Sequence, residues 1–440
     1  MIKVKKIKFI KRHCLNRKTL VIELVLLFLS KLIVDFEYRY FVFEYYEYMG
    51  FVFNFDLTIY IFGWILYFGL YFILYSKRNL FIYDFYLFIF LLWCLPNIVI
   101  YTFHNQNLYF LMLLLIPFIL IVSLTFDNSI IKIKKITKGK PIILFFSFII
   151  LITVLVNYGI TTRGNLVFDL SKVYDQRDEF GELSSVGIFG YLNSWAFKFF
   201  STLLLAWSIY KRKIFLVFLS VLFIILLFGF SGHKSSLTAL ILVLFFYFLY
   251  KFKNTSLVII VGFFVLIVGS IFLGLILNSM MPESLILRRL LIVPAHLNFT
   301  YLEYFSNNEF IYWSNSILKS FSIYPYDVHF VKVIGEYLGF PNMAANTGFI
   351  ASGYVHAGIF GIMLYTFFAI ILMNIINTFS KTNEKYFVMS IIFIPLMSMY
   401  SSSDLPTSLL THGVLIAVLI LYFYDKKTYI FKIGKLKYEI

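Results

Sequence analysis

Long apolar runs separated by short polar turns make up most of this chain. Most of these runs are long enough to cross a hydrocarbon core of roughly 30 Å at 1.5 Å per helical residue. The pattern therefore predicts an all-α integral membrane protein with about twelve transmembrane helices. The runs fall at about 20–34, 57–76, 80–100, 108–125, 141–160, 190–210, 214–230, 235–250, 256–277, 348–377, 386–400 and 407–424.

Lysine and arginine gather on one side of this pattern. The N-terminus, nearly every second turn and the C-terminal tail together hold 27 of the 38 basic residues. Because basic connections stay in the cytoplasm, both termini are predicted to be cytoplasmic. The longest polar segment, residues 279–347, then follows the ninth helix as a large extracytoplasmic loop. We expect one polytopic domain, 1–440, with this loop as a subdomain within it.

Composition and charge narrow the class of protein further. With 61% hydrophobic and 14% charged residues, the chain is not typical of a soluble globular protein. The net charge of +16 comes from bases that flank apolar runs, where they orient helices and attract anionic lipid. We therefore expect membrane lipid, and no nucleic acid, among the partners. Acidic and aromatic residues follow the run at 20–34 in place of a small-residue cleavage site, which predicts an uncleaved first helix.

Several motifs of common catalytic classes are absent. The sequence contains no Walker loop, no His-Glu-x-x-His and no Cys-x-x-Cys, so it offers no nucleotide, metal or cofactor signature. Few charged residues lie inside the predicted spans, whereas an ion-coupled transporter usually has more acids at mid-membrane. These observations favour chemistry or recognition on the outer face.

The start of the long loop carries the strongest candidate site. Arg288 and Arg289 precede Pro294, and from there His296, Thr300 and Glu303 follow at spacings of four and three residues, which places these three on one helical face. Fixed cations beside a carboxylate and a histidine suit an anionic phosphate substrate and proton transfer. A second interpretation stays open, in which the arginines extend to lipid headgroups and the histidine and glutamate are solvated.

Eight short segments follow one another over residues about 170–365. One lies in the expected outer loop after the fifth helix, one at the start of the next helix, one opens a helix with a Gly–basic–Ser step, and five bracket the large loop. They are Tyr174–Phe180, Gly190–Trp195, Ser231–Leu240, Arg288–Pro294, Tyr301–Ser306, Ile334–Tyr337, Ala345–Gly348 and Gly353–Gly361. In this order they resemble segments of the oligosaccharide repeat-unit polymerases that build O-antigen and capsule.

This resemblance implies a GT-C-like, metal-independent glycosyltransferase in the bacterial cytoplasmic (inner) membrane, without a cofactor. Its substrates would be glycans linked to undecaprenyl diphosphate, with a chain-length co-polymerase as a possible partner. Cations must then stabilise the diphosphate leaving group. The matching cations are Arg177, Lys234, Arg288 and Arg289; the candidate bases are Asp178, Glu179, His296 and Glu303; Tyr301 and Asn346 are further candidates for substrate contact.

Other interpretations of the same residues remain. Arg177 lies among acids that could form an exposed ion-pair cluster, Asn346 could cap the helix that follows it, and His356 is expected to be structural. Two other functions also fit a multi-pass chain of this kind. An O-antigen ligase would share the lipid-linked donor and differ in its acceptor, and a flippase of lipid-linked oligosaccharides would line a cavity within the bilayer with its charges.

Overall fold

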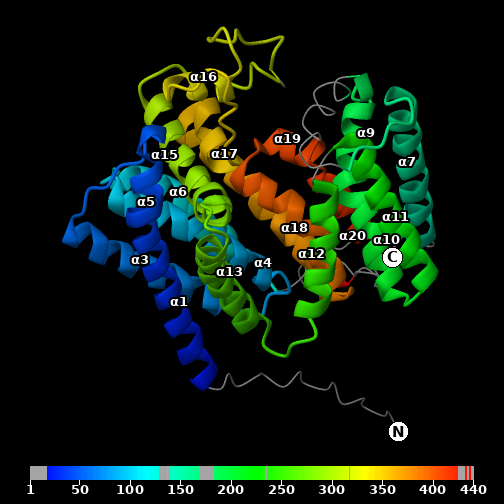
Figure 1. Ribbon diagram of the computed structural model, residues 1–440, viewed down its shortest axis with the longest axis horizontal. Helices are drawn as coiled ribbons and strands as arrows, with labels where there is room; N and C mark the ends of the chain where they lie inside the picture. Colours follow the sequence, from blue (N-terminus) through cyan, green and yellow to red (C-terminus); the bar gives the residue numbers. More distant parts are fainter. Residues whose placement is uncertain are drawn as a thin grey trace.

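The computed structural model is a bundle of helices (Figure 1). It describes residues 17–127, 136, 139–168, 180, 183–232, 235–316, 318–424, 432–433 and 436–437. Within these residues, the strands are limited to a two-residue antiparallel pair, Lys432–Ile433 with Leu436–Lys437. The predicted all-helical class is confirmed.

The first half of the chain supplies long apolar helices and a short irregular segment. Where a helix widens locally, a π-helical stretch (η) joins two α-helical parts. The elements are α1 (Arg17–Glu37), η1 (Tyr38–Phe43), α2 (Glu44–Tyr46), η2 (Glu47–Met49), α3 (Leu57–Ser76), α4 (Tyr83–Ile89), η3 (Phe90–Cys94), α5 (Leu95–Phe103), α6 (Leu108–Ser123), α7 (Gly139–Thr161), α9 (Phe189–Trp195), η4 (Ala196–Phe200) and α10 (Ser201–Tyr210), with η2 a 3₁₀ turn.

The second half continues this pattern and adds short helices at one end of the bundle. The elements are α11 (Ile214–Ser231), α12 (Ser235–Leu249), α13 (Thr255–Leu277), α14 (Met281–Glu283), η5 (Ser284–Ile292), α15 (Val293–Ser306), α16 (Phe330–Tyr337), α17 (Phe349–Ser380), α18 (Lys385–Ser401), α19 (Leu405–Leu410) and α20 (Val414–Tyr424).

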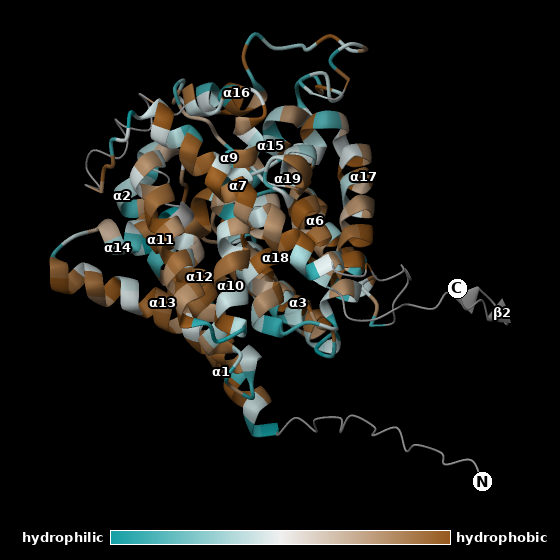
Figure 2. Cartoon of the chain, turned by 90° about the vertical axis from the view of Figure 1, so that its right-hand side faces the viewer, coloured by the Kyte–Doolittle hydropathy of each residue, from teal (hydrophilic) through white to brown (hydrophobic). Residues whose placement is uncertain are grey.

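Seven helices among the described residues are long and apolar enough to cross a membrane, and three shorter apolar helices accompany them. Hydrophobic residues cover these helices, and hydrophilic residues gather toward the connections (Figure 2). The chain is therefore consistent with a multi-pass membrane protein, while the twelve spans and their orientation remain predictions. We call the end with the N-terminus of α1 the inner end and the end with α16 the outer end (Figure 1).

The first part of the predicted loop packs into the helical core. The helix α15 lies against α5, α6 and α17. Its residues Leu297, Phe299 and Phe305 are buried in the same hydrophobic cluster as the long helices of the first half. This burial follows from the apolar positions of α15, which cover most of its surface. Residues 293–306 are thus part of the packed core.

A glycine turn divides α17 at the outer end. Ala357 and Gly358 leave helical geometry, and Gly358 has a positive φ of 58°, which glycine adopts without the strain of a side chain. The turn brings the backbone of Gly353 against Gly361, where a Cβ on Gly361 would lie 1.9 Å from the Gly353 carbonyl oxygen. Residues 349–356 therefore form a separate short helix at the outer end.

Two ion pairs lie in the first part of the bundle. Glu23 accepts two hydrogen bonds from Arg78, at 2.7 and 3.0 Å, and one from Ser256. Lys31 donates to Asp35 at 2.6 Å within the same helix. The contacts of Glu23 join α1 to α13 and to the turn after α3, and both pairs avoid the cost of a single buried charge.

Candidate functional site

The paired arginines lie on a helix that is widened rather than broken. Residues 281–306 form one continuous helix, with π-type hydrogen bonding over Ser284–Ile292. Pro294 has no N–H to donate, and its ring crowds the carbonyl four residues earlier. The backbone N–H groups before it therefore bond to the carbonyl five residues back, as the Val293 N–H does to the Arg288 carbonyl. Such π-type segments are frequent at functional sites.

The two arginines have different surroundings. Arg288 is half-buried: its Nε donates to Ser284 Oγ at 2.9 Å, and its guanidinium lies 4.2 Å from the ring centroid of Tyr46 and 3.3 Å from the sulfur of Met49. Arg289 is exposed, and no hydrogen bond or ion pair of its side chain occurs among the described residues. One cation is held in place, and its neighbour is available to an anion.

Two carboxyl groups lie next to this segment. Glu37, at the end of α1, is 9% exposed. Burial, and to a smaller extent the negative charge of Glu283, raise the pKa of Glu37 to about 7. Burial also raises the pKa of Glu283, which precedes Arg288 by about one π-helical turn. A carboxyl that titrates near neutral pH can act as a general base or acid.

His296 lies in a closed apolar site beneath the segment at residues 50–52. Both of its ring nitrogens are buried without a hydrogen-bond partner in the described structure. The rings of Phe51 and His104 lie 5.1 and 5.3 Å away between centroids. Burial lowers the pKa of His296 to about 4 and, together with the charge of His296, that of His104 to about 3. His296 is therefore a neutral imidazole that solvent does not reach, which corrects the alternative in which it is solvated.

His296, Thr300 and Glu303 all lie on α15, but they differ in accessibility. His296 and Thr300 are buried, whereas Glu303 is exposed. Fifteen residues of helix separate Glu303 from Arg288, which corresponds to roughly 20 Å at 1.5 Å per residue. Glu303 is therefore not a carboxylate beside the arginines.

Tyr301 and Asn346 also differ from expectation. Tyr301 is fully buried and its hydroxyl donates to the Ala345 carbonyl at 2.6 Å, so the ring is closed to a sugar in this conformation. Asn346 is exposed and does not cap α17, whose N-cap is Gly348. A Cβ on Gly348 would lie 1.8 Å from the Tyr400 carbonyl oxygen, so this cap is fixed by backbone packing.

The remaining candidates lie outside the described residues. These are Arg177, Asp178, Glu179 and Lys234, together with His233 beside Lys234.

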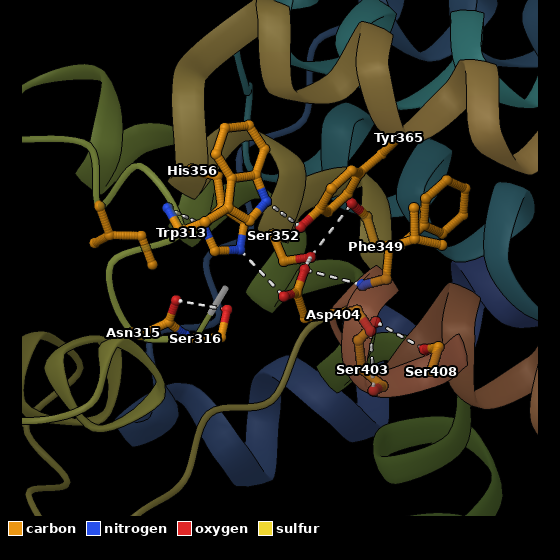
Figure 3. Close-up of polar contacts among 12 residues, drawn as sticks. Trp313, Asn315, Ser316, Phe349, Ser352, His356, Tyr365, Ser403, Asp404 and Ser408 are labelled. Atoms are coloured by element: carbon orange, nitrogen blue, oxygen red, sulfur yellow. Dashed lines mark hydrogen bonds and ion pairs between the residues drawn. The ribbon is translucent and has the colours of Figure 1, made fainter. Parts of the chain in front are cut away.

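A second polar cluster at the outer end surrounds Asp404 (Figure 3). Asp404 caps α19 by accepting from the Leu405 N–H at 2.9 Å, and it accepts from Ser352 Oγ at 2.9 Å and from His356 Nε2 at 3.1 Å. Burial raises the pKa of Asp404. Hydrogen bonds from His356, Ser352 and Tyr365 lower it by more, so its net pKa lies below the usual value.

Trp313 completes the surroundings of His356. Its backbone N–H donates to His356 Nδ1 at 3.2 Å, its ring stacks on the imidazole with centroids 5.0 Å apart, and its Nε1–H donates to the Tyr365 hydroxyl at 2.7 Å. Tyr312 and Trp313 both have positive φ values, 46° and 57°, which are strained for residues with side chains. Both ring nitrogens of His356 are engaged, so His356 positions the loop and is not free to act as a base, in line with its expected structural role.

The sequence around Asp404 contains a helix N-cap pattern that catalytic motifs do not include. An aspartate followed two residues later by Pro406 is typical of a helix N-cap. Glu37 and Glu283 were visible only as members of acidic segments, because their raised pKa values depend on burial and on each other.

Among the residues that the structure describes, no group of three or more histidine, cysteine, aspartate or glutamate side chains could hold a metal ion. Comparison of the chain with protein-family models, with curated proteins and with solved structures finds no match.

Proposed function

We propose that this protein is a membrane glycosyltransferase that polymerises oligosaccharide repeat units carried on undecaprenyl diphosphate, at the outer face of the cytoplasmic membrane. The order of short segments supports the family, and the multi-pass helical fold is compatible with it. The observation that carries the chemistry is an exposed Arg289 beside a fixed Arg288, on the helix that also carries Glu283, whose charge acts on the Glu37 carboxyl group.

In this reaction the bond between the anomeric carbon of the growing glycan and the diphosphate oxygen breaks. A new bond forms from that carbon to a hydroxyl of the acceptor repeat unit, and the hydroxyl loses its proton. Arg289 would stabilise the charge that develops on the leaving diphosphate, because a guanidinium donates two parallel hydrogen bonds to phosphate oxygens. Arg288 would support it from its position under Tyr46.

Glu37 is the carboxyl group that we assign as proton acceptor. A base is most effective when its pKa lies near the working pH, and burial next to Glu283 brings the pKa of Glu37 to about 7. His296, in contrast, has both nitrogens enclosed, with its pKa lowered to about 4. Glu37 therefore replaces His296 and Glu303 as the preferred base in this proposal.

The test is a set of single substitutions at Arg289 in the producing cell. We expect Arg289→Ala to reduce polymer formation by about 100- to 1000-fold, the usual loss for one contact made in the transition state. Arg289→Lys should also be impaired, because a point charge does not reproduce the two parallel hydrogen bonds. Lys319→Ala, an exposed cation of the same segment, is the matched control and should leave polymer length and amount unchanged.

The glycan that accumulates distinguishes the three candidate functions. A defective polymerase leaves single repeat units on the final acceptor, a defective ligase leaves long polymer on the lipid carrier, and a defective flippase leaves unpolymerised units on the cytoplasmic leaflet. Long polymer on the carrier in the Arg289→Ala strain, with normal protein level, would refute the polymerase and favour the ligase. Normal polymer in that strain would remove Arg289 from the site.

A further inference from the structure

A cavity of about 470 Å³ lies at the inner end of the bundle, between the α12–α13 turn and the α17–α18 turn. This volume is within the range of small-ligand sites, about 300–1,000 Å³. The cavity is at the end opposite α16 and is not part of the site around Arg288. It is lined by Tyr247, Tyr250, Lys251, Phe252, Lys253, Thr255, Asn383, Glu384, Lys385 and Tyr386.

Two of its three lysines have uncompensated charges. Lys385 lies 3.5 Å from the carboxylate of Asp84, which balances it. The ammonium group of Lys251 lies 4.3 Å from the ring centroid of Tyr247, and Lys253 is exposed. Within the described residues neither Lys251 nor Lys253 forms an ion pair with a carboxylate, so the cavity presents two cations against Glu384 alone.

The floor of the cavity is held by one buried carboxylate. Asp84 is 1% exposed and accepts from the Tyr250 hydroxyl at 3.0 Å and from Thr255 Oγ1 at 3.2 Å, in addition to its contact with Lys385. These bonds join α4, the end of α12, α13 and the start of α18. The lining is therefore preorganised, which reduces the entropy that a ligand would lose on binding.

We propose that this cavity binds the phosphoryl headgroup of an anionic phospholipid from the leaflet at the inner end. Lysine ammonium groups bind phosphate as point charges, and basic pockets between membrane helices on the cytoplasmic side take anionic headgroups. Phe248 and Phe252 next to the lysines are 55% and 58% exposed, which provides an apolar surface for acyl chains. Soluble phosphate would use the lysines and leave this apolar surface uncovered.

The experiment measures thermal stabilisation of the purified full-length protein in detergent by three additives. These are phosphatidylglycerol, phosphatidylcholine and inorganic phosphate. We expect phosphatidylglycerol to stabilise the wild type, with the other two having little effect, and the stabilisation to weaken as salt is raised. In the Lys251→Gln/Lys253→Gln variant the apparent affinity for phosphatidylglycerol should fall about 30-fold, at roughly fivefold per lysine.

Two further variants keep the proposal open to refutation. Lys211→Gln/Lys213→Gln removes two exposed lysines of another turn with the same change of charge and should retain the wild-type affinity. Lys251→Arg/Lys253→Arg keeps the charge and should also retain it. The proposed site would be overturned if the Lys211/Lys213 variant lost as much affinity for phosphatidylglycerol as the Lys251/Lys253 glutamine variant. It would also be overturned if the Lys251/Lys253 glutamine variant kept the full wild-type affinity. Equal stabilisation by inorganic phosphate would overturn the lipid as its source.

Discussion

Replacement of Asp404 by asparagine tests the outer polar cluster without changing the shape of a side chain. In the native protein one carboxylate oxygen accepts from Ser352 and from the Leu405 N–H, and the other accepts from His356. An asparagine has only one oxygen, and its other position is an NH₂ donor. Whichever way the amide is turned, a donor of the cluster then faces a second donor.

The magnitude follows from counting the groups that lose a partner. Ser352 can rotate its hydroxyl, but the Leu405 N–H cannot move, and His356 Nε2–H cannot change tautomer because Nδ1 accepts from Trp313. One stranded donor costs about 1–3 kcal/mol, and the loss of charge-assisted bonds adds about 1 kcal/mol. We expect Asp404→Asn to destabilise the protein by roughly 2–4 kcal/mol, or about 4–8 °C at roughly 2 °C per kcal/mol.

The assay is thermal unfolding followed by fluorescence-detected size exclusion in detergent. Asp56→Asn is the matched control, since Asp56 is also a helix N-cap, accepting from the Ile59 N–H at 3.0 Å, but is exposed. Asparagine and aspartate cap helices about equally well, so Asp56→Asn should change the midpoint very little. Equal midpoints for the two variants would refute the argument that buried donors make Asp404 specific.

The pH dependence of this difference has a definite sign. Although burial raises the pKa of Asp404, its contacts with His356, Ser352 and Tyr365 lower it by more, so its pKa when folded is below the unfolded value of about 4. Its contribution is fully present above the unfolded pKa and is lost as the pH falls through the folded pKa. The gap between wild type and Asp404→Asn should therefore be constant from about pH 5 to 8 and shrink only in stronger acid.

Two further predictions concern the base and the orientation. Burial and, to a smaller extent, the charge of Glu283 raise the pKa of Glu37, so Glu283→Gln should lower that pKa. The acidic limb of the pH profile of polymerisation, measured in membranes, should then move to lower pH. An unmoved limb would exclude Glu37 as the base. For the orientation, single cysteines replace Asn307 or Lys135 in a chain without Cys14 and Cys94. In intact cells, with the outer membrane permeabilised in a Gram-negative host, an impermeant maleimide should label the cysteine at 307 and not the one at 135. Labelling at 135 but not at 307 would invert the predicted orientation.

The helical class could be predicted from sequence because the solvent of a membrane protein imposes it. Backbone groups in hydrocarbon must be satisfied within the segment, so a run such as Thr255–Leu277 has no alternative to a helix. The same argument does not identify irregularities within a helix. Proline suits the first turn of a helix, but Pro294 lies within a continuous one, where the hydrogen bonding of residues 284–292 widens to a π-type pattern.

The site could be predicted only in part, because accessibility depends on residues that are distant in sequence. Arg288 and Arg289 are adjacent, yet contacts with Tyr46 and Met49, about 240 residues earlier, fix one and not the other. The charge pattern of the loop contains no information about these contacts. Sequence reasoning therefore identified the pair of cations and could not distinguish their roles.

Burial also determines which acid and which histidine can transfer a proton. His296 and Glu303 have favourable spacing on a helix, but spacing does not report that the first is enclosed by Phe51 and the second is exposed about four turns from the arginines. Glu37 has no motif, and its proposed role as a base depends on its burial at the end of α1 and on the charge of Glu283, about 250 residues later in the chain. A proton acceptor of this kind is a property of packing, so a search for acids that end one helix against the start of another would find it where a search for motifs does not.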